Sequence, residues 1–340
     1  MQASASKPLR IGILGAANIA RQFVSAVAPS KLVAVTTVAS RDPAKAESFA
    51  KECGIPRALG SYEALLADPD IDAIYNPLPN TMHAEWSIRA AEAGKHVLCE
   101  KPLATTAADA RAMFAAARRH NVHLVEAYPY LAQQQTLKLR ELVAAGSIGK
   151  IQLIRSSFGV FFADPANIRL KPDLGGGALF DGGSYAVSLV RVVAGERPER
   201  VSAVARWSET GVDKTIAATL EFRSGLLAQI TCSFATAWHR HALIVGESGA
   251  IETTYLNHPP IGGPPALSIR RGVRAASTPE ILEVEGGNGF LLEAESFQKL
   301  VALGPAHWTG ATEEESVDIA LTLDAILQSA RSGAPAVVLP

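Results

Sequence analysis

Several features are scarce in this sequence, and each scarcity excludes a class of protein. Among its 340 residues are three cysteines, Cys53, Cys99 and Cys232, which are too few and too scattered for a disulfide framework or a zinc site. No run approaches the roughly 18–20 uninterrupted apolar residues of a membrane span. Residues 1–7 are mostly polar and lack the apolar core of a secretion signal, so we expect a cytoplasmic protein.

An excess of charge of either sign is also absent. Lys and Arg total 32, Asp and Glu total 33, and the net charge of -1 gives no reason to expect a nucleic acid or an anionic membrane as partner. Hydrophobic residues make up 48% of the chain and charged residues 19%, which is typical of a globular protein. At roughly 100–200 residues per domain, the length predicts about two domains.

The first third of the chain alternates short apolar runs with helical segments. Strands are predicted at residues 10–14, 32–39, 71–75, 96–99 and 123–127, and helices at 81–93 and 106–120. Repeated strand–helix–strand units of this length predict a parallel sheet covered on both faces. We therefore expect an α/β domain over residues 1–126.

The pattern changes in the remainder of the chain, where strands dominate and many of them alternate apolar with polar residues. The predicted strands are residues 151–158, 201–206, 215–222, 226–234, 242–245, 250–255, 266–270 and 281–284, with helices at 133–145, 180–194, 290–302 and 313–332. Such alternation is typical of an antiparallel sheet with one covered face. Residues 127–340 should form an α+β domain with a large, open, mainly antiparallel sheet, and residues 256–265 a Pro/Gly-rich surface loop.

A glycine-containing turn lies between the first predicted strand and a helix. Its residues are Gly15, Ala16, Ala17, Asn18, Ile19 and Ala20, which fit the dinucleotide-binding G-x-G-x-x-G/A pattern except for Ala17 in the middle position. A methyl group there reduces the clearance for a pyrophosphate but does not forbid binding at the helix N-terminus. A plain tight turn is the alternative.

The end of the second strand predicts which dinucleotide is preferred. An acidic residue there would bond a ribose 2′-hydroxyl and repel a 2′-phosphate. The strand instead ends before Ser40 and Arg41, a hydroxyl and a guanidinium that suit the phosphate. We expect NADP rather than NAD, although Asp42 would be the acid if the strand ended later.

Two further segments follow predicted strands, at the edge where open α/β sheets bind ligands. The first contributes Asn76, Pro77, Leu78, Asn80 and His83 as candidate cofactor contacts, in a turn stiffened by proline. The second contributes Glu100 and Lys101, also as candidate cofactor contacts. Pro102 follows, and the Lys101–Pro102 peptide bond can be cis. A Pro-rich surface loop and an ordinary salt bridge of Glu100 are the alternatives.

A glycine-rich segment, residues 175–185, precedes and enters a predicted helix. Asp181 and Tyr185 are four residues apart and should lie on one helix face. Lys101 from the other domain would complete an acid–base set, because a nearby cation favours the phenolate that exchanges a proton with a hydroxyl. Without Lys101, a capping role for Asp181 and a core position for Tyr185 would be the better interpretation.

In this order and spacing, the four segments resemble the Gfo/Idh/MocA oxidoreductase family, and the resemblance extends from Ile11 to the C-terminal helix. It implies a Rossmann domain followed by a domain whose open sheet often serves dimer contacts, so a homodimer or higher homo-oligomer is expected. The family's lysine corresponds to Lys101 and its Asp-x-x-x-His/Tyr pair to Asp181 and Tyr185. Tyrosine at the second place is similar to the glucose–fructose oxidoreductase, dihydrodiol and xylose dehydrogenase branch.

One departure concerns the substrate. In related sugar enzymes the stretch matching residues 126–134 often carries a basic residue and a His, whereas Leu131 and Gln133 stand here. Candidate substrate residues are Tyr128, Tyr130, Asn167 and Arg169. The resemblance implies NADP-dependent oxidation of a sugar-like hydroxyl and the reverse reaction.

The sequence is also compatible with other functions. A cofactor- or sugar-sensing regulator on the same fold is one alternative, although it would need neither Lys101 nor Tyr185. A dihydrodiol dehydrogenase is another. A metal-dependent dehydrogenase is disfavoured, since the close pair His239 and His241 lacks nearby Cys or acidic ligands in the sequence.

Overall fold

A computed structural model describes residues 7–162, 164, 166–259, 263–273 and 278–339. Residues 1–6 of the N-terminal segment and 260–262 of the expected loop lie outside the described residues. Tertiary contacts divide the chain into two compact units. The first comprises Met1–Ala104, Ala108–Ala132 and Asn288–Thr312, and the second comprises Thr105–Ala107, Gln133–Gly287 and Glu313–Pro340.

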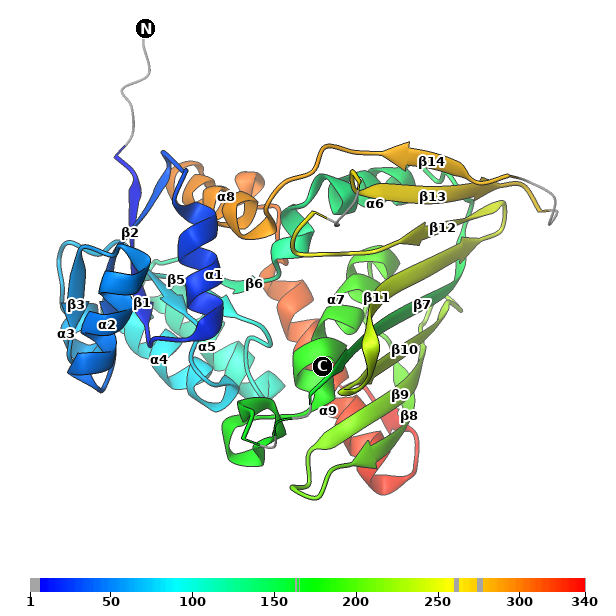
Figure 1. Ribbon diagram of the computed structural model, residues 1–340. Coiled ribbons are helices and arrows are strands. Elements are labelled where there is room, and N and C mark those ends of the chain that lie inside the picture. The colour runs from blue at the N-terminus through cyan, green and yellow to red at the C-terminus, as the bar shows by residue number, and fades with distance from the viewer. Residues whose placement is uncertain (1–6, 163, 165, 260–262, 274–277, 340) are drawn as a thin grey trace, which may run out of the picture. The chain divides into compact units, whose positions relative to one another are not determined.

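The first unit contains the predicted parallel sheet (Figure 1). Its strands are β1 (Leu9–Leu14), β2 (Val33–Ala39), β3 (Arg57–Leu59), β4 (Ala73–Asn76), β5 (His96–Glu100) and β6 (Leu124–Ala127), in the order β3-β2-β1-β4-β5-β6. All neighbours pair in parallel. The order reverses between β1 and β4, which is the place where such sheets bind ligands. Sequence patterns missed β3, because it is three residues long and carries no apolar run.

Helices cover both faces of this sheet. They are α1 (Asn18–Val27), α2 (Pro43–Cys53), α3 (Tyr62–Leu66), α4 (His83–Glu92), α5 (Ala107–Arg119) and α8 (Gly289–Leu303). Phe23 of α1, Phe49 of α2 and Phe297 of α8 share one apolar core with β1, β2 and β4. On the other face Leu65 of α3 packs so close to Gly12 that a Cβ there would lie 2.8 Å from the leucine Cδ1.

The second unit is built on the expected large sheet. Its strands are β7 (Ile151–Phe161), β8 (Arg200–Trp207), β9 (Asp213–Glu221), β10 (Leu227–Ser233), β11 (Ala235–Gly246), β12 (Gly249–Thr253), β13 (Ala266–Arg271), β14 (Glu280–Glu283) and β15 (Ala336–Val337). They lie in the order β14-β13-β12-β11-β7-β10-β9-β8-β15. The pairs are antiparallel except β7 with β10.

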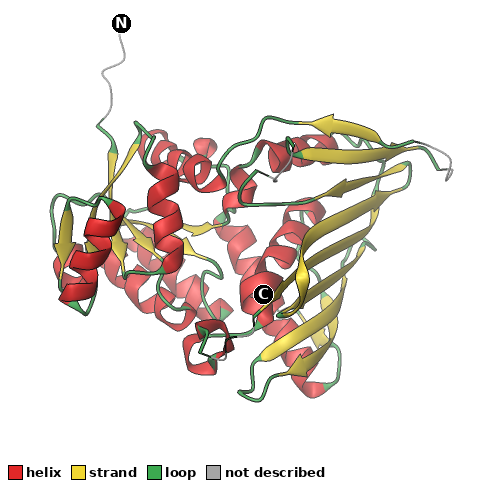
Figure 2. Ribbon diagram, in the orientation of Figure 1, coloured by secondary structure: helices red, strands yellow, loops and turns green. Residues whose placement is uncertain are grey.

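Three helices, α6 (Gln134–Ala144), α7 (Ser184–Ala194) and α9 (Glu313–Ser332), pack on one face of this sheet (Figure 2). Along β10 the side chains of Ile230 and Cys232 are buried, whereas Leu227 remains 46% exposed on the opposite face. Arg191 of α7 donates to Asp318 of α9 at 2.8 Å, a buried ion pair that joins the two helices. The predicted alternation, and with it the half-covered sheet, is confirmed.

Most elements begin or end within about three residues of their expected bounds, and two depart further. Strand β11 begins at Ala235 rather than at residue 242, because its first half pairs with β7 across an irregular register without apolar alternation. The predicted helix 180–194 begins with a π-helical turn, Leu179–Gly183, before α7. Among the described residues, no helix combines the length and apolar character that crossing a membrane requires.

Candidate functional site

The turn after β1 leaves the first turn of α1 accessible to an anion. Gly15 has φ +84°, and a Cβ there would lie 3.1 Å from Cδ2 of Leu78. The N-cap Ala17 provides no side-chain acceptor, and the first turn of α1 carries no acidic residue. Backbone N–H groups at such a helix end bind phosphate well, because they are unsatisfied and lie at the positive end of the helix dipole.

The end of β2 carries a cation beside this turn. The carboxylate of Asp42 accepts the N–H groups of Ala44 at 3.1 Å and Lys45 at 3.3 Å, and so caps α2. Arg41 is exposed and lies near the Tyr62 hydroxyl, where burial raises the pKa of the phenol and the guanidinium partly offsets that rise.

The same phenol connects Arg41 to the glycine turn. The Tyr62 hydroxyl lies 3.5 Å from the place of a Cβ on Gly15. Ser40 is buried, and its hydroxyl accepts the N–H of Asp42 at 3.2 Å. The acid is thus committed to its helix, and the cation stands next to the anion-accepting turn.

A buried network fixes the segment after β4. The Asn76 side chain donates to the hydroxyl of Ser87 at 3.0 Å and accepts the N–H of Leu78 at 3.3 Å. The His83 ring contacts the carbonyl oxygens of Pro102 at 2.9 Å and Leu78 at 2.7 Å, and burial lowers its pKa. His83 thus ties two ligand-edge loops together, while a direct cofactor contact of its ring stays a prediction.

Lys101 follows directly on β5. The carboxylate of Glu100, the last residue of that strand, accepts the Tyr75 hydroxyl at 2.6 Å in the interior of the first unit. The Lys101–Pro102 bond is cis, as the sequence allowed. The next residue, Leu103, donates its N–H to the buried carboxylate of Glu126 at 2.8 Å. The main chain at Lys101 is therefore held on both sides, by the contacts of Glu100 before it and of Leu103 after it.

A third buried carboxyl group, that of Glu293, lies near those of Glu100 and Glu126, and sequence patterns did not identify it. Glu293 of α8 is 1% exposed, and its pKa is raised well above its usual range by burial and by the charges of Glu100 and Glu126. Tyr128 and Tyr130, predicted as substrate residues, are fully buried and meet edge to face at 6.2 Å. Their substrate contacts stay predictions.

In the second unit, Asp181 pairs with a cation of its own unit. Arg169 Nε donates to Asp181 Oδ2 at 2.8 Å, and the guanidinium lies 5.2 Å from the ring centre of Phe162. The side chain of Asn167 accepts the N–H of Arg169 at 3.1 Å and begins the 3₁₀ turn Ile168–Leu170. Three predicted residues, Asn167, Arg169 and Asp181, are thus connected within one unit.

Tyr185 is set among residues that sequence patterns did not identify. Its hydroxyl accepts a hydrogen bond from Asn257 Nδ2 at 2.9 Å. Arg240 lies over its ring at 3.9 Å, and the ring of Phe158 stacks near it at 5.8 Å. Arg240 and Asn257 could have been suspected only as polar residues of a strand and a loop, which is too weak a signal for an assignment.

The buried carboxyl group of Asp213 accepts a backbone N–H group at the start of the helical segment that contains Asp181 and Tyr185. Asp213 Oδ2 accepts the N–H of Leu179 at 2.7 Å. Burial raises the pKa of Asp213 to about 7, although the N–H groups of Leu179 and Ala178 oppose that rise. Gly177, with φ +127°, leaves room for this carboxyl group, because a Cβ there would lie 2.2 Å from Asp213 Oδ1.

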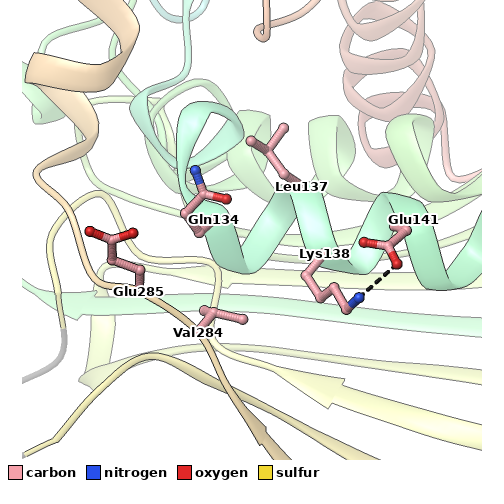
Figure 3. Close-up of a pocket in the computed structure, with 6 residues that line it drawn as sticks. All are labelled: Gln134, Leu137, Lys138, Glu141, Val284 and Glu285. Carbon is pink, nitrogen blue, oxygen red and sulfur yellow. Dashed lines mark hydrogen bonds and ion pairs between the residues drawn. The ribbon is translucent and has the colours of Figure 1, made fainter.

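A separate open hollow of about 290 Å³ lies between α6 and the end of β14 (Figure 3). Its lining residues are Gln134, Leu137, Lys138, Glu141, Val284 and Glu285. Lys138 is engaged by Glu141 at 2.6 Å, and none of the six is a predicted site residue. Among the residues that the structure describes, no group of three His, Cys, Asp or Glu is placed to hold a metal ion.

Comparison with known proteins identifies relatives for both units. Residues 9–128 match the family described as "Oxidoreductase family, NAD-binding Rossmann fold", and residues 136–252 match the GFO/IDH/MocA C-terminal domain. The chain is 36% identical over 328 residues to D-xylose 1-dehydrogenase (NADP⁺) 2 of Haloferax volcanii, covering 96% of this chain and 98% of the relative. It is 34% identical to trans-1,2-dihydrobenzene-1,2-diol dehydrogenase of Xenopus laevis, covering 93% and 96%.

A solved structure is similar over the same extent. It is a 3-ketoreductase from Actinomadura kijaniata in complex with NADP and TDP-benzene, with a TM-score of 0.86 and 33% identity, covering 96% of this chain and 98% of that one. This ketoreductase has also been solved with one lysine replaced by alanine and with one tyrosine replaced by phenylalanine.

Proposed function

The chain belongs to the Gfo/Idh/MocA oxidoreductase family, and from this premise we propose that it is an NADP-dependent dehydrogenase acting on a CH–OH group of a sugar-like substrate. The observation that carries the cofactor choice is Arg41 beside the glycine turn, with Asp42 committed to capping α2. A 2′-phosphate would be paired by the Arg41 guanidinium, while the Asp42 carboxylate accepts the N–H groups at the start of α2.

The residues of the first unit fit this cofactor. Gly15 adopts a positive φ and has no side chain that could block the turn. Ala17 does not cap α1 with its side chain, so the N–H groups of the first turn can bind a pyrophosphate. Asn76 and His83 hold the neighbouring loop in a fixed conformation. When bound, NADP⁺ supplies the nicotinamide ring that accepts a hydride from the substrate carbon.

The proposed task of the side chains concerns the hydroxyl proton. Tyr185, as phenolate, takes that proton while the carbon–oxygen double bond forms, and it returns the proton in the reverse direction. Lys101 donates a hydrogen bond to the same oxygen and steadies its developing charge. Asp181, held by Arg169, orients the sugar through hydrogen bonds that the ion pair keeps in place.

One relative, named a D-xylose dehydrogenase, supports a sugar substrate, and another, named a dihydrodiol dehydrogenase, supports a cyclic diol. We propose a cyclic hydroxyl compound, with an aldose oxidised at its hemiacetal carbon as the leading case. A dihydrodiol is the alternative within the same chemistry.

The test combines cofactor binding with turnover. The purified protein is titrated with NADP and NAD and then assayed with aldoses, polyols and a dihydrodiol by the appearance of reduced nicotinamide. Lys101→Ala and Tyr185→Phe should each lower kcat by roughly 100-fold or more while NADP binding stays within about twofold, as expected for groups that act on the transition state. The exposed Lys51→Ala is the matched control.

Two results would contradict this assignment. Wild-type turnover in either variant would remove the proposed role of that residue. Tight cofactor binding without turnover of any compound in the panel would favour the sensing regulator.

A homodimer is part of the same proposal. Val204 (72% exposed), Leu227 (46%) and Ile281 (59%) lie on the sheet face opposite the helices. Ala203 and Ala228, the strand neighbours of the first two, are buried on the helix side. Such exposed apolar side chains favour pairing with a second copy. Val204→Lys with Leu227→Lys should halve the mass measured in solution, and an unchanged mass would refute this interface.

We also propose a cytoplasmic location. It is supported by the three cysteines, all of which are free, with Cys99 and Cys232 buried. Fractionation of cells that produce the protein tests it, and recovery from an extracellular or periplasmic fraction would contradict it.

A further inference from the structure

We propose that Arg240 and Asn257 are positioning residues that fix the Tyr185 phenol and bias its oxygen toward the ionised form. This inference rests on the proposed function of Tyr185 as the proton acceptor. All three residues belong to the second unit, so their geometry is local to it.

The first step is the direction of the hydrogen bonds. Arg240 Nη1 donates to Asn257 Oδ1 at 3.2 Å, and Asn257 Nδ2 donates to the Tyr185 hydroxyl at 2.9 Å. A guanidinium has donors only, so the oxygen of the Asn257 amide must face Arg240 and its NH₂ group must face the phenol. Tyr185 therefore receives a hydrogen bond from Asn257, and a bond that is received stabilises a phenolate.

The second step is charge. Arg240 is 6% exposed, and its guanidinium carbon lies 3.9 Å from the centre of the Tyr185 ring. A buried cation is screened less than an exposed one and acts strongly on a charge a few ångströms away. The positive charge that favours the ionised phenol is thus present within the second unit and does not depend on Lys101 alone.

A neighbouring tyrosine provides an internal comparison. Arg240 also lies 4.6 Å from the ring centre of Tyr255. The Tyr255 hydroxyl, however, donates to the carbonyl oxygen of Ser157 at 2.9 Å, and burial raises its pKa to about 12. The hydroxyl of Ser156 also lies 2.9 Å from the Tyr255 hydroxyl. Donation to a carbonyl oxygen favours the neutral form of Tyr255, whereas the bond that Tyr185 accepts from the Asn257 amide favours its phenolate.

The third step is how the loop that contains Asn257 is held in place. The Gln133 side chain donates to the main-chain carbonyls of Asn257 at 3.0 Å and Gly287 at 2.7 Å. Gln133 precedes α6 and is itself buried, so the loop that bears Asn257 is fixed to the start of that helix. The amide is held in place before any substrate arrives.

Ionisation of Tyr185 can be measured directly and without turnover. The chain has six tyrosines, and the difference in tyrosinate absorbance between a protein and its Tyr185→Phe counterpart isolates one of them. We expect Arg240→Met to raise the pH of Tyr185 ionisation by about 1–2 units and Asn257→Ala by about half as much. Arg240→Lys, which keeps the charge, should restore most of the shift.

The pH profile of kcat for substrate oxidation should follow the titration, with its acidic limb displaced by the same amount in each variant. Arg223→Met, at an exposed arginine in the turn between β9 and β10, is the control and should leave both readouts unchanged. An unchanged Tyr185 titration in both folded variants, Arg240→Met and Asn257→Ala, would overturn the inference. Wild-type kcat in Tyr185→Phe would overturn the proposed function instead, and the titration would still decide the role of Arg240.

Discussion

Replacing Asp213 by Asn tests whether burial outweighs hydrogen bonding at the start of the site helix. The carboxyl group is 2% exposed, and its pKa is raised from the usual 3.8 to about 7, chiefly by burial. A shift of roughly 3 units corresponds to about 4 kcal/mol, at about 1.36 kcal/mol per unit.

The sign follows from proton binding. Because the pKa of Asp213 is higher in the folded state, the folded protein binds a proton that the unfolded chain has already released between pH 3.8 and about 7. The stabilisation is full below pH 3.8 and is lost as the pH rises through about 7. Asparagine is neutral throughout, and its Oδ1 can still accept the N–H of Leu179.

The assay is urea unfolding of wild type and Asp213→Asn at several pH values, followed by tryptophan fluorescence. The free energy of unfolding of wild type minus that of the variant should fall by roughly 4 kcal/mol from about pH 4 to about pH 8. Asp173→Asn, at an exposed position, should give a constant difference. A constant difference for Asp213→Asn as well would mean that the backbone N–H groups outweigh burial, and the reasoning would be wrong.

Three further changes test other parts of the structure. Arg41→Ala should weaken NADP binding about 10–100-fold and leave NAD binding unchanged, because one charge-assisted hydrogen bond to a phosphate contributes about 1.5–3 kcal/mol. Calorimetric titrations with both cofactors measure this. Equal losses of affinity for NADP and NAD, or a similar loss in the exposed Arg111→Ala, would contradict it. Gly182→Ala would place a Cβ 2.4 Å from Phe158 Cδ1, next to Tyr185, so kcat should fall while NADP affinity is retained, and unchanged kcat would refute it. Glu293→Gln should be more thermostable than wild type at alkaline pH, because the raised pKa makes ionisation of this buried carboxyl group costly, and a lower melting temperature at every pH would argue against it.

Much of the Rossmann half of the site could be predicted, because its signals are local. A strand, a glycine turn and a helix start follow one another in the chain, so Gly15 and Arg41 are placed by their neighbours. The partners of Tyr185 could not be found in this way. Arg240 and Asn257 lie more than 50 residues from Tyr185 in the chain. The pairing of β11 with β7, the packing of α7 on the sheet and the loop after β12 bring them together.

The sequence by itself determined the two kinds of sheet, since periodicity reports whether a strand is buried on one face or on both, and the strand–turn–helix order reports a dinucleotide turn. Only the tertiary structure decided which charges meet: Asp181 with Arg169, Tyr185 with Arg240, and Glu293 with two other buried carboxyl groups. The physical reason is that hydrophobic periodicity is read along the chain, whereas an ion pair or a perturbed pKa depends on distances between segments far apart in it.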